Sequence, residues 1–132
     1  PVFTTVPFQS IDRRTNETIL NWDISNPNYI ESLIRQDARI DYKISFLSTN
    51  PGGTWTAESV IVVDRKQTNG SFIPEQIDFS KSYTGNFRGE NQLITGYSDT
   101  VLNEGDRVRL EYIEFGLTGN LTGVGMSVTS RV

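Results

Sequence analysis

The chain has 132 residues, with no cysteine, no histidine, 12 lysines and arginines and 16 aspartates and glutamates. Its length suits one domain, and its 36% hydrophobic and 11% aromatic residues are enough for a single core. The absence of cysteine excludes disulfides, thiolate nucleophiles and cysteine zinc sites, and the absence of histidine excludes a Ser-His-Asp triad. The net charge of −4 argues against a nucleic-acid partner, and no apolar run is long enough for membrane insertion.

The N-terminal third contains the first candidate β-strands. Residues 2–8 and 18–24 are strand candidates, and residues 29–35 fit either a helical turn or a strand. Residues 38–48 alternate with a period of two, which predicts a strand with one buried face. The positions on that face are Ala38, Ile40, Tyr42, Ile44 and Phe46.

The middle of the chain begins with a strand that is apolar on both faces. Residues 57–65 include the run Val60–Val63, which predicts burial on both sides, by the core and by a partner subunit. Asn69-Gly70 is typical of a tight turn. Residues 74–92 are polar and rich in turn-forming residues, so we expect long loops around a short strand at 77–79.

The last third alternates between strands and turns. We expect strands at 93–102, 107–115 and 124–132, a turn at 103–106 and a glycine-rich loop at 116–123. No segment has the apolar period of an amphipathic helix. Short strands at this spacing predict an all-β fold, an antiparallel β-sandwich or barrel.

Few groups in this sequence could carry out catalysis. Glu111 and Glu114 lie close together on a predicted strand, but a spacing of three puts them on opposite faces, so they cannot flank one glycosidic bond. The acidic turn 103–106 lacks the calcium-loop pattern and is explained by a β-turn. The glycine-rich segment 116–123 has no following lysine or helix start, so it does not resemble a phosphate loop. We therefore predict no catalytic residue, no metal and no cofactor.

Two groups of side chains could instead bind a partner. Arginine outnumbers lysine nine to three, and Arg107 and Arg109 share a strand face with Glu111. That face is either a charge ladder between subunits or a solvated sheet surface. Aromatic residues near predicted loops, such as Trp55 and Tyr83, could stack on sugar rings or bury themselves in the core.

The order of these features resembles the tumour-necrosis-factor-like jelly roll, which is shared with the globular heads of complement. The most specific match is Leu102-x-x-Gly105-Asp106-x-Val108-x-Leu110, which is similar to the family's Leu-x-x-Gly-Asp-x-Val-x-Leu signature. Weaker matches are the early Val6-Pro7-Phe8 strand, the tyrosine strand at 38–46, the strand at 59–70 that ends in Asn-Gly, and the final strand at 124–128.

The resemblance implies an antiparallel jelly roll of about eight to ten strands. We expect residues 1–132 to form a single head domain, the C-terminal fragment of a longer fibre protein, that assembles as a homotrimer. The predicted trimer interface comprises Ile61, Val63, Arg107, Arg109 and Tyr112.

The predicted function is receptor binding without catalysis, at the tip of a fibre on a cell or virion surface. The partner is a cell-surface glycan or protein receptor, with a glycan preferred. The candidate ligand-binding residues are Trp55, Tyr83, Asn86, Phe87, Arg88 and Asn120. The main alternative is a structural capsid, spike or decoration jelly roll with no receptor, and a carboxylate-only glycosidase ranks below it.

Overall fold

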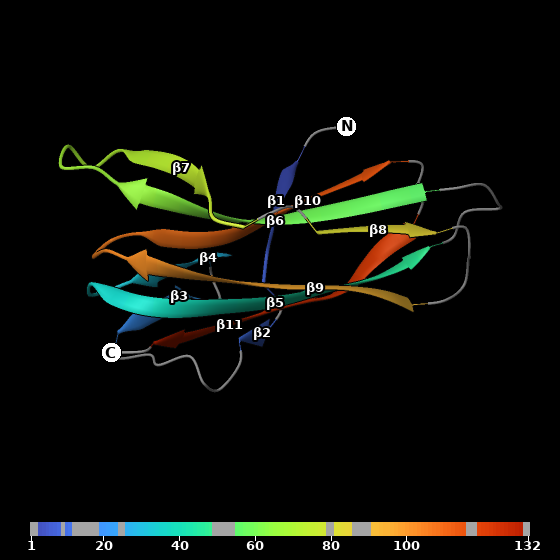
Figure 1. The fold of residues 1–132 in the computed structure, drawn as a ribbon, viewed down its shortest axis with the longest axis horizontal. Helices are drawn as coiled ribbons and strands as arrows, with labels where there is room; N and C mark the ends of the chain where they lie inside the picture. Colours follow the sequence, from blue (N-terminus) through green and yellow to red (C-terminus); the bar gives the residue numbers. More distant parts are fainter. Residues whose placement is uncertain are drawn as a thin grey trace.

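Two β-sheets pack face to face in the computed structural model (Figure 1). The structure describes residues 3–8, 10–11, 19–23, 26–48, 55–78, 81–85, 91–115 and 119–130. Within these ranges the regular elements are all strands, which confirms the all-β antiparallel sandwich. The same ranges contain no helix with the length and hydropathy of a membrane span.

The larger sheet has seven strands in the described part of the chain. Its main order is β3-β4-β10-β6-β7, while β1 pairs with β10 and β8 pairs with β6. The strands are β1 (Thr4–Val6), β3 (Leu20–Asp23), β4 (Asn26–Ser32), β6 (Trp55–Lys66), β7 (Phe72–Gln76), β8 (Lys81–Gly85) and β10 (Arg107–Phe115).

The smaller sheet has four strands in the order β2-β11-β5-β9. They are β2 (Ser10–Ile11), β5 (Gln36–Ser48), β9 (Asn91–Leu102) and β11 (Gly119–Ser130). The pairings of β5 with β9 and of β5 with β11 are antiparallel and long, so β5 is the central strand of this sheet. β9 lies at the edge.

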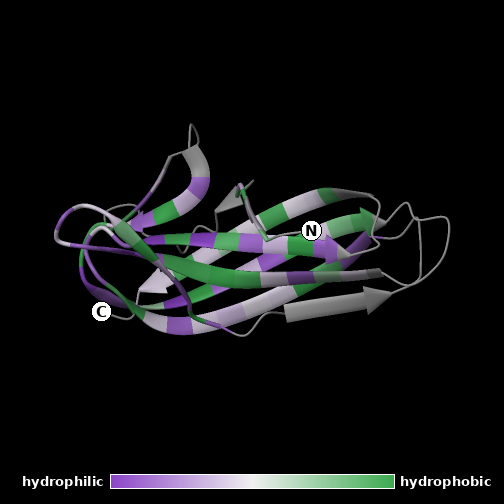
Figure 2. Cartoon of the chain, turned by 90° about the horizontal axis from the view of Figure 1, so that it is seen from above, coloured by the Kyte–Doolittle hydropathy of each residue, from purple (hydrophilic) through white to green (hydrophobic). Residues whose placement is uncertain are grey.

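The core lies between the two sheets and is built by alternation along the strands. Every second residue of β5 from Ala38 to Phe46 is buried, as the sequence predicted. On the facing sheet, Val108 pairs with Val63 and Leu110 pairs with Ile61, and all four side chains are fully buried. The resulting alternation of apolar and polar residues is visible along the strands in Figure 2.

A hydrogen bond ties the two sheets together inside this core. The hydroxyl of Tyr42, on β5, lies 2.8 Å from the Oγ of Ser59, on β6, and both residues are buried. Gly96, on β9, leaves room for the tyrosine ring: a Cβ there would lie 2.7 Å from three ring-end atoms of Tyr42. A larger residue at this position would therefore push the ring away from its partner.

The structure decides the open choice at 29–35 in favour of a strand, and it corrects the expectations for 74–92, where β8 occupies part of the expected loops, and for 116–123. The segment 29–35 is extended up to Ser32, the end of β4, and then bends. Residues 77 and 78, for which a strand was expected, instead lie in the break between β7 and β8. There the carboxylate of Asp78 accepts a hydrogen bond from the backbone N–H of Ile61. The loop expected at 116–123 is too long, because β11 begins at Gly119.

Candidate functional site

Large apolar side chains are exposed along the outward face of the edge strand β9. Leu93, Tyr97 and Val101 are 52%, 56% and 38% exposed, and they follow one another at every fourth residue. They alternate with inward positions such as Ile94, which is buried. A row of apolar side chains on an edge strand is a surface that proteins usually cover.

Charged residues of β5 lie beside this row. Asp41 is the register partner of Tyr97, and Arg39 is the register partner of Asp99. The guanidinium of Arg39 stacks on the ring of Tyr97 at 4.3 Å, and its Nε lies 3.3 Å from both carboxylate oxygens of Asp41. We call Leu93, Tyr97, Val101, Arg39 and Asp41 the β9 face. It joins an apolar strip to a paired charge, the composition of a protein contact surface.

The outward face of the larger sheet is organised differently. Val60 and Val62 face outward on β6, and both are only 1% exposed. Beside them Arg109 pairs with Asp64, with N–O distances of 2.8 and 3.2 Å, and with Glu111 at 2.9 Å. Burial alone would lower the pKa of Arg109. The carboxylates of Asp64 and Glu111 have the larger combined effect, so its pKa is raised. The expected burial of 60–63 on both faces is thus found within a single chain.

The side chains predicted for the trimer interface fall into two groups. Ile61, Val63 and Tyr112 belong to the core cluster of one chain and are 0%, 0% and 5% exposed, so they offer no surface to a second copy. Burial, together with the nearby carboxylate of Glu114, raises the pKa of the Tyr112 hydroxyl. Arg107 and Arg109 face outward, and their part in an interface stays a prediction.

Arg107 contacts two aromatic rings. Its guanidinium carbon lies 4.4 Å from the ring centroid of Tyr29 and 4.3 Å from that of Phe72. These rings come from β4 and β7, which lie on either side of β10 and β6 in the sheet. Three segments distant in sequence therefore meet at this point. Glu31 lies 3.9 Å from the Nε of Arg107.

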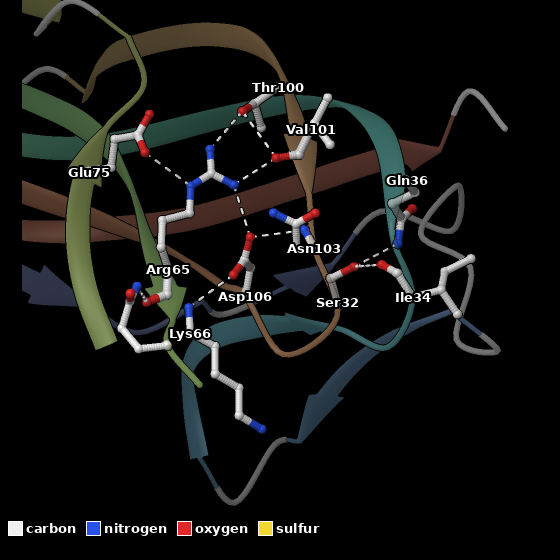
Figure 3. Close-up of polar contacts among 11 residues, drawn as sticks. Ser32, Ile34, Gln36, Arg65, Lys66, Glu75, Thr100, Val101, Asn103 and Asp106 are labelled. Atoms are coloured by element: carbon white, nitrogen blue, oxygen red, sulfur yellow. Dashed lines mark hydrogen bonds and ion pairs between the residues drawn. The ribbon is translucent and has the colours of Figure 1, made fainter. Parts of the chain in front are cut away.

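The Gly-Asp segment that carries the sequence resemblance forms a buried clamp (Figure 3). Asp106 is 1% exposed, and its carboxylate accepts hydrogen bonds from Arg65 Nη1 at 2.9 Å and from the backbone N–H groups of Lys66 and Asn103. Gly105, with φ of +88°, turns the chain so that the aspartate points inward. The segment is therefore a turn with a structural role, as expected for 103–106.

Arg65 extends the clamp to the other sheet. It reaches from β6 to β9, where it donates to the carbonyl of Val101 at 2.6 Å and to Oγ1 of Thr100 at 3.1 Å. On its own sheet it pairs with Glu75 at 3.1 Å. The alternation of the strands did not reveal this residue, because its partners are brought together only by the packing of the two sheets.

The described candidate ligand residues lie on strands at one end of the sandwich, on the right in Figure 1. β6 begins at Trp55, which pairs with Gly85 at the end of β8, while Tyr83 pairs with Ala57. Asn120 pairs with Leu47 near the start of β11. Asn86, Phe87 and Arg88 lie outside the described residues. The fold thus brings the backbone positions of three of the six residues, namely Trp55, Tyr83 and Asn120, to the same end.

The acidic groups considered for chemistry are engaged in structure. Glu111 pairs with Arg109 on the outward face, while Glu114 accepts a hydrogen bond from the Tyr112 hydroxyl at 3.1 Å. The two carboxylates therefore lie on opposite faces, as their spacing predicted. Across the residues that the structure describes, no three acidic side chains come together as a metal site would require.

Comparison with known proteins shows the fold. No family model matches the sequence, and no curated protein matches it. The structure is similar to that of Eiger TNF from S. frugiperda, with a TM-score of 0.57 and 9% sequence identity, over 98% of this chain and 85% of that chain. The chain therefore has a TNF-like jelly-roll fold, as the sequence resemblance implied.

Proposed function

We propose that this chain is the trimeric head domain of a surface fibre and that it binds a cell-surface receptor, a glycan, without catalysing a reaction. The TNF-like jelly roll supports a role in recognition. The observation that carries the proposal is the β9 face, since Leu93 and Tyr97 are both more than half exposed in a single chain. Covering such side chains removes apolar surface from water, which favours association.

The contact between copies is placed on the β9 face. Arg39 and Asp41 form an ion pair there whose side chains are 41% and 35% exposed, so the charges can remain at the solvated rim while the apolar row is covered. Ile61, Val63 and Tyr112 are occupied in the core and are not part of the proposed contact.

The receptor contact is placed at the end of the sandwich that carries Trp55, Tyr83 and Asn120. A trimer presents three copies of this end, so weak single sites act together and bind with high avidity. This arrangement suits a protein that stands outside the cell or virion and attaches to a surface covered with repeated glycans.

A glycan array probed with the intact chain, together with adsorption to intact cells, tests this function. We expect a set of related glycans to bind, and we expect Trp55→Ala and Tyr83→Ala to reduce the signal while the circular dichroism spectrum is unchanged. Ile73→Ser is the control, because Ile73 is an exposed apolar residue on β7 and lies outside the proposed receptor contact. Absence of both signals would reject receptor binding and favour the structural alternative.

A further inference from the structure

The surroundings of Arg107 differ from those of Arg65 and Arg109, the other described arginines on the larger sheet. The guanidinium carbon of Arg107 lies over the rings of both Tyr29 and Phe72, 4.4 and 4.3 Å from their centroids. Its Nε is buried and has no hydrogen-bond partner within the described part of the chain. The ion pair to Glu31 is long, at 3.9 Å. Among the residues that the structure describes, the cation is thus held by stacking and by one long ion pair.

Arg65 and Arg109 provide an internal comparison. Arg65 donates hydrogen bonds to Asp106, Glu75, Thr100 and the Val101 carbonyl. Arg109 donates to both oxygens of Asp64 and to Thr5, and it pairs with Glu111. Each of these side chains is 20% exposed, whereas that of Arg107 is 34% exposed. The first two arginines are saturated by their own chain, whereas Arg107 has only the long ion pair to Glu31 among the polar groups of the described residues.

We propose that Arg107 is the carboxylate-binding residue of a subsite for an acidic sugar. A planar guanidinium whose faces are stacked offers its edge to a ligand, and two parallel N–H groups match the two oxygens of a carboxylate. The rings of Tyr29 and Phe72 hold the guanidinium in one orientation, which reduces the side-chain entropy lost on binding. This inference rests on the proposed function for the class of ligand, a glycan, and adds a second contact to it, because Arg107 pairs with Asp64 near the end of β6 whereas Trp55 lies at its start.

The position of the subsite within the sheet favours a sugar over a peptide. Extended peptides bind at sheet edges through main-chain hydrogen bonds. Arg107 instead lies on β10, which is paired with β4 on one side, at Glu31, and with β6 on the other, at Asp64. The strand has no free edge there, so a ligand has to bind through the side chains alone.

Glu31 is the intramolecular competitor for this cation. Its carboxylate is 28% exposed and lies beside the guanidinium, so an incoming anion meets its negative charge. Glu31→Gln removes that charge with little change of shape. It is therefore expected to strengthen the binding of a carboxylate and to leave the binding of a neutral sugar unchanged.

Titration of the intact protein with glucuronic acid, followed by two-dimensional NMR, tests the subsite. The neutral reference ligand is glucuronamide, which replaces the carboxylate with an amide. We expect glucuronic acid to shift the signals of residues around Arg107, with glucuronamide binding about tenfold more weakly or not at all. Because both probes are monovalent, the result does not depend on the oligomeric state.

Three variants assign the effect to Arg107. Arg107→Lys keeps the charge but loses the planar fork, so we expect its affinity for glucuronic acid to fall about tenfold, while Glu31→Gln increases it. Arg35→Lys is the matched control, because Arg35 is exposed and lies at the turn between β4 and β5. Thermal melting checks that each variant is folded, and Glu31→Gln tests the proposal even where Arg107→Lys unfolds.

The possible outcomes separate this inference from the proposed function. Equal affinity of the wild type and Arg107→Lys for glucuronic acid overturns the subsite, and so does tighter binding of a short peptide with a free C-terminal carboxylate. An array that is positive only for neutral glycans also overturns the subsite but leaves receptor binding intact. An array with no signal, together with glucuronic acid binding that depends on Arg107, overturns the receptor function and supports the subsite.

Discussion

The hydroxyl of Tyr42 and the Oγ of Ser59 lie 2.8 Å apart and join the two sheets in the middle of the core. Burial is the main reason why the pKa of Tyr42 is raised to about 12, from a usual value of 10.0. The native fold therefore disfavours the tyrosinate more strongly than the unfolded chain does. This buried hydroxyl makes the stability of the sandwich sensitive to alkaline pH.

We predict that the free energy of unfolding falls between pH 10 and pH 12. Below pH 10 the tyrosine is protonated in both states, so its contribution is fully present, and it is lost as pH rises through the native pKa of about 12. The loss from Tyr42 is on the order of 3 kcal/mol. Urea unfolding at several pH values measures it, and Tyr42→Phe is expected to make the slope shallower, with the remaining slope coming from Tyr112, whose pKa is also raised by burial. An equal slope in Tyr42→Phe would contradict this role.

Gly96→Ala tests the fit of the Tyr42 ring. The new Cβ would lie 2.7 Å from the end of the ring, which cannot move without losing Ser59. We expect a loss of about 1–3 kcal/mol in the free energy of unfolding. The cost should fall by about 1 kcal/mol in a Tyr42→Leu background, because the clash is then removed. Additive effects of the two substitutions in a double-mutant cycle would show that the ring is not the obstacle.

The clamp at Arg65 allows a comparison between two carboxylates that share one partner. The side chain of Asp106 is 2% exposed and that of Glu75 is 56% exposed. We expect Asp106→Asn to cost about 2 kcal/mol, since buried donors lose their acceptor, and Glu75→Gln to cost less than about 0.5 kcal/mol. Chemical denaturation measures both values. Equal costs would mean that burial of the clamp does not matter.

Substitution of the β9 face tests the proposed contact between copies. The double variant Leu93→Ser/Tyr97→Ser removes two exposed apolar side chains, so we expect the trimer to dissociate into monomers. Because both side chains are exposed in the single chain, the fold of each monomer should lose little stability. Ile73→Ser is the matched control, because Ile73 is 57% exposed but lies on β7. Light scattering coupled to gel filtration measures the mass. Dissociation by the control alone would place the contact on the other sheet.

The sequence predicted which side of a strand faces the core where apolar and polar residues alternate, but not where every position is apolar. Apolar and polar residues alternate with a period of two at 38–48 and 107–115, and the structure has a strand at each place. In the run Val60–Val63 every position is apolar, so the pattern contains no information on which pair faces the core. That choice depends on the pairing of Ile61 with Leu110 and of Val63 with Val108.

The remaining differences come from interactions between residues distant in sequence. β11 begins at Gly119 because Ser48, at the end of β5, extends the ladder into a segment rich in glycine and threonine. The Arg65 clamp and the stacking of Arg107 each need side chains from at least three strands. The β9 face could be predicted in part, because Leu93, Tyr97 and Val101 are separated by even numbers of residues and so lie on one side of a strand. What the sequence does not show is that no described segment of the same chain fully covers them.

Sedimentation equilibrium of the unmodified chain at micromolar concentration is the most direct test of the trimeric head. The chain mass is 14.9 kDa, so we predict a single species with three times that mass, stable on dilution through the micromolar range. A species with the mass of one chain across the same range would contradict the proposed assembly and the avidity that depends on it.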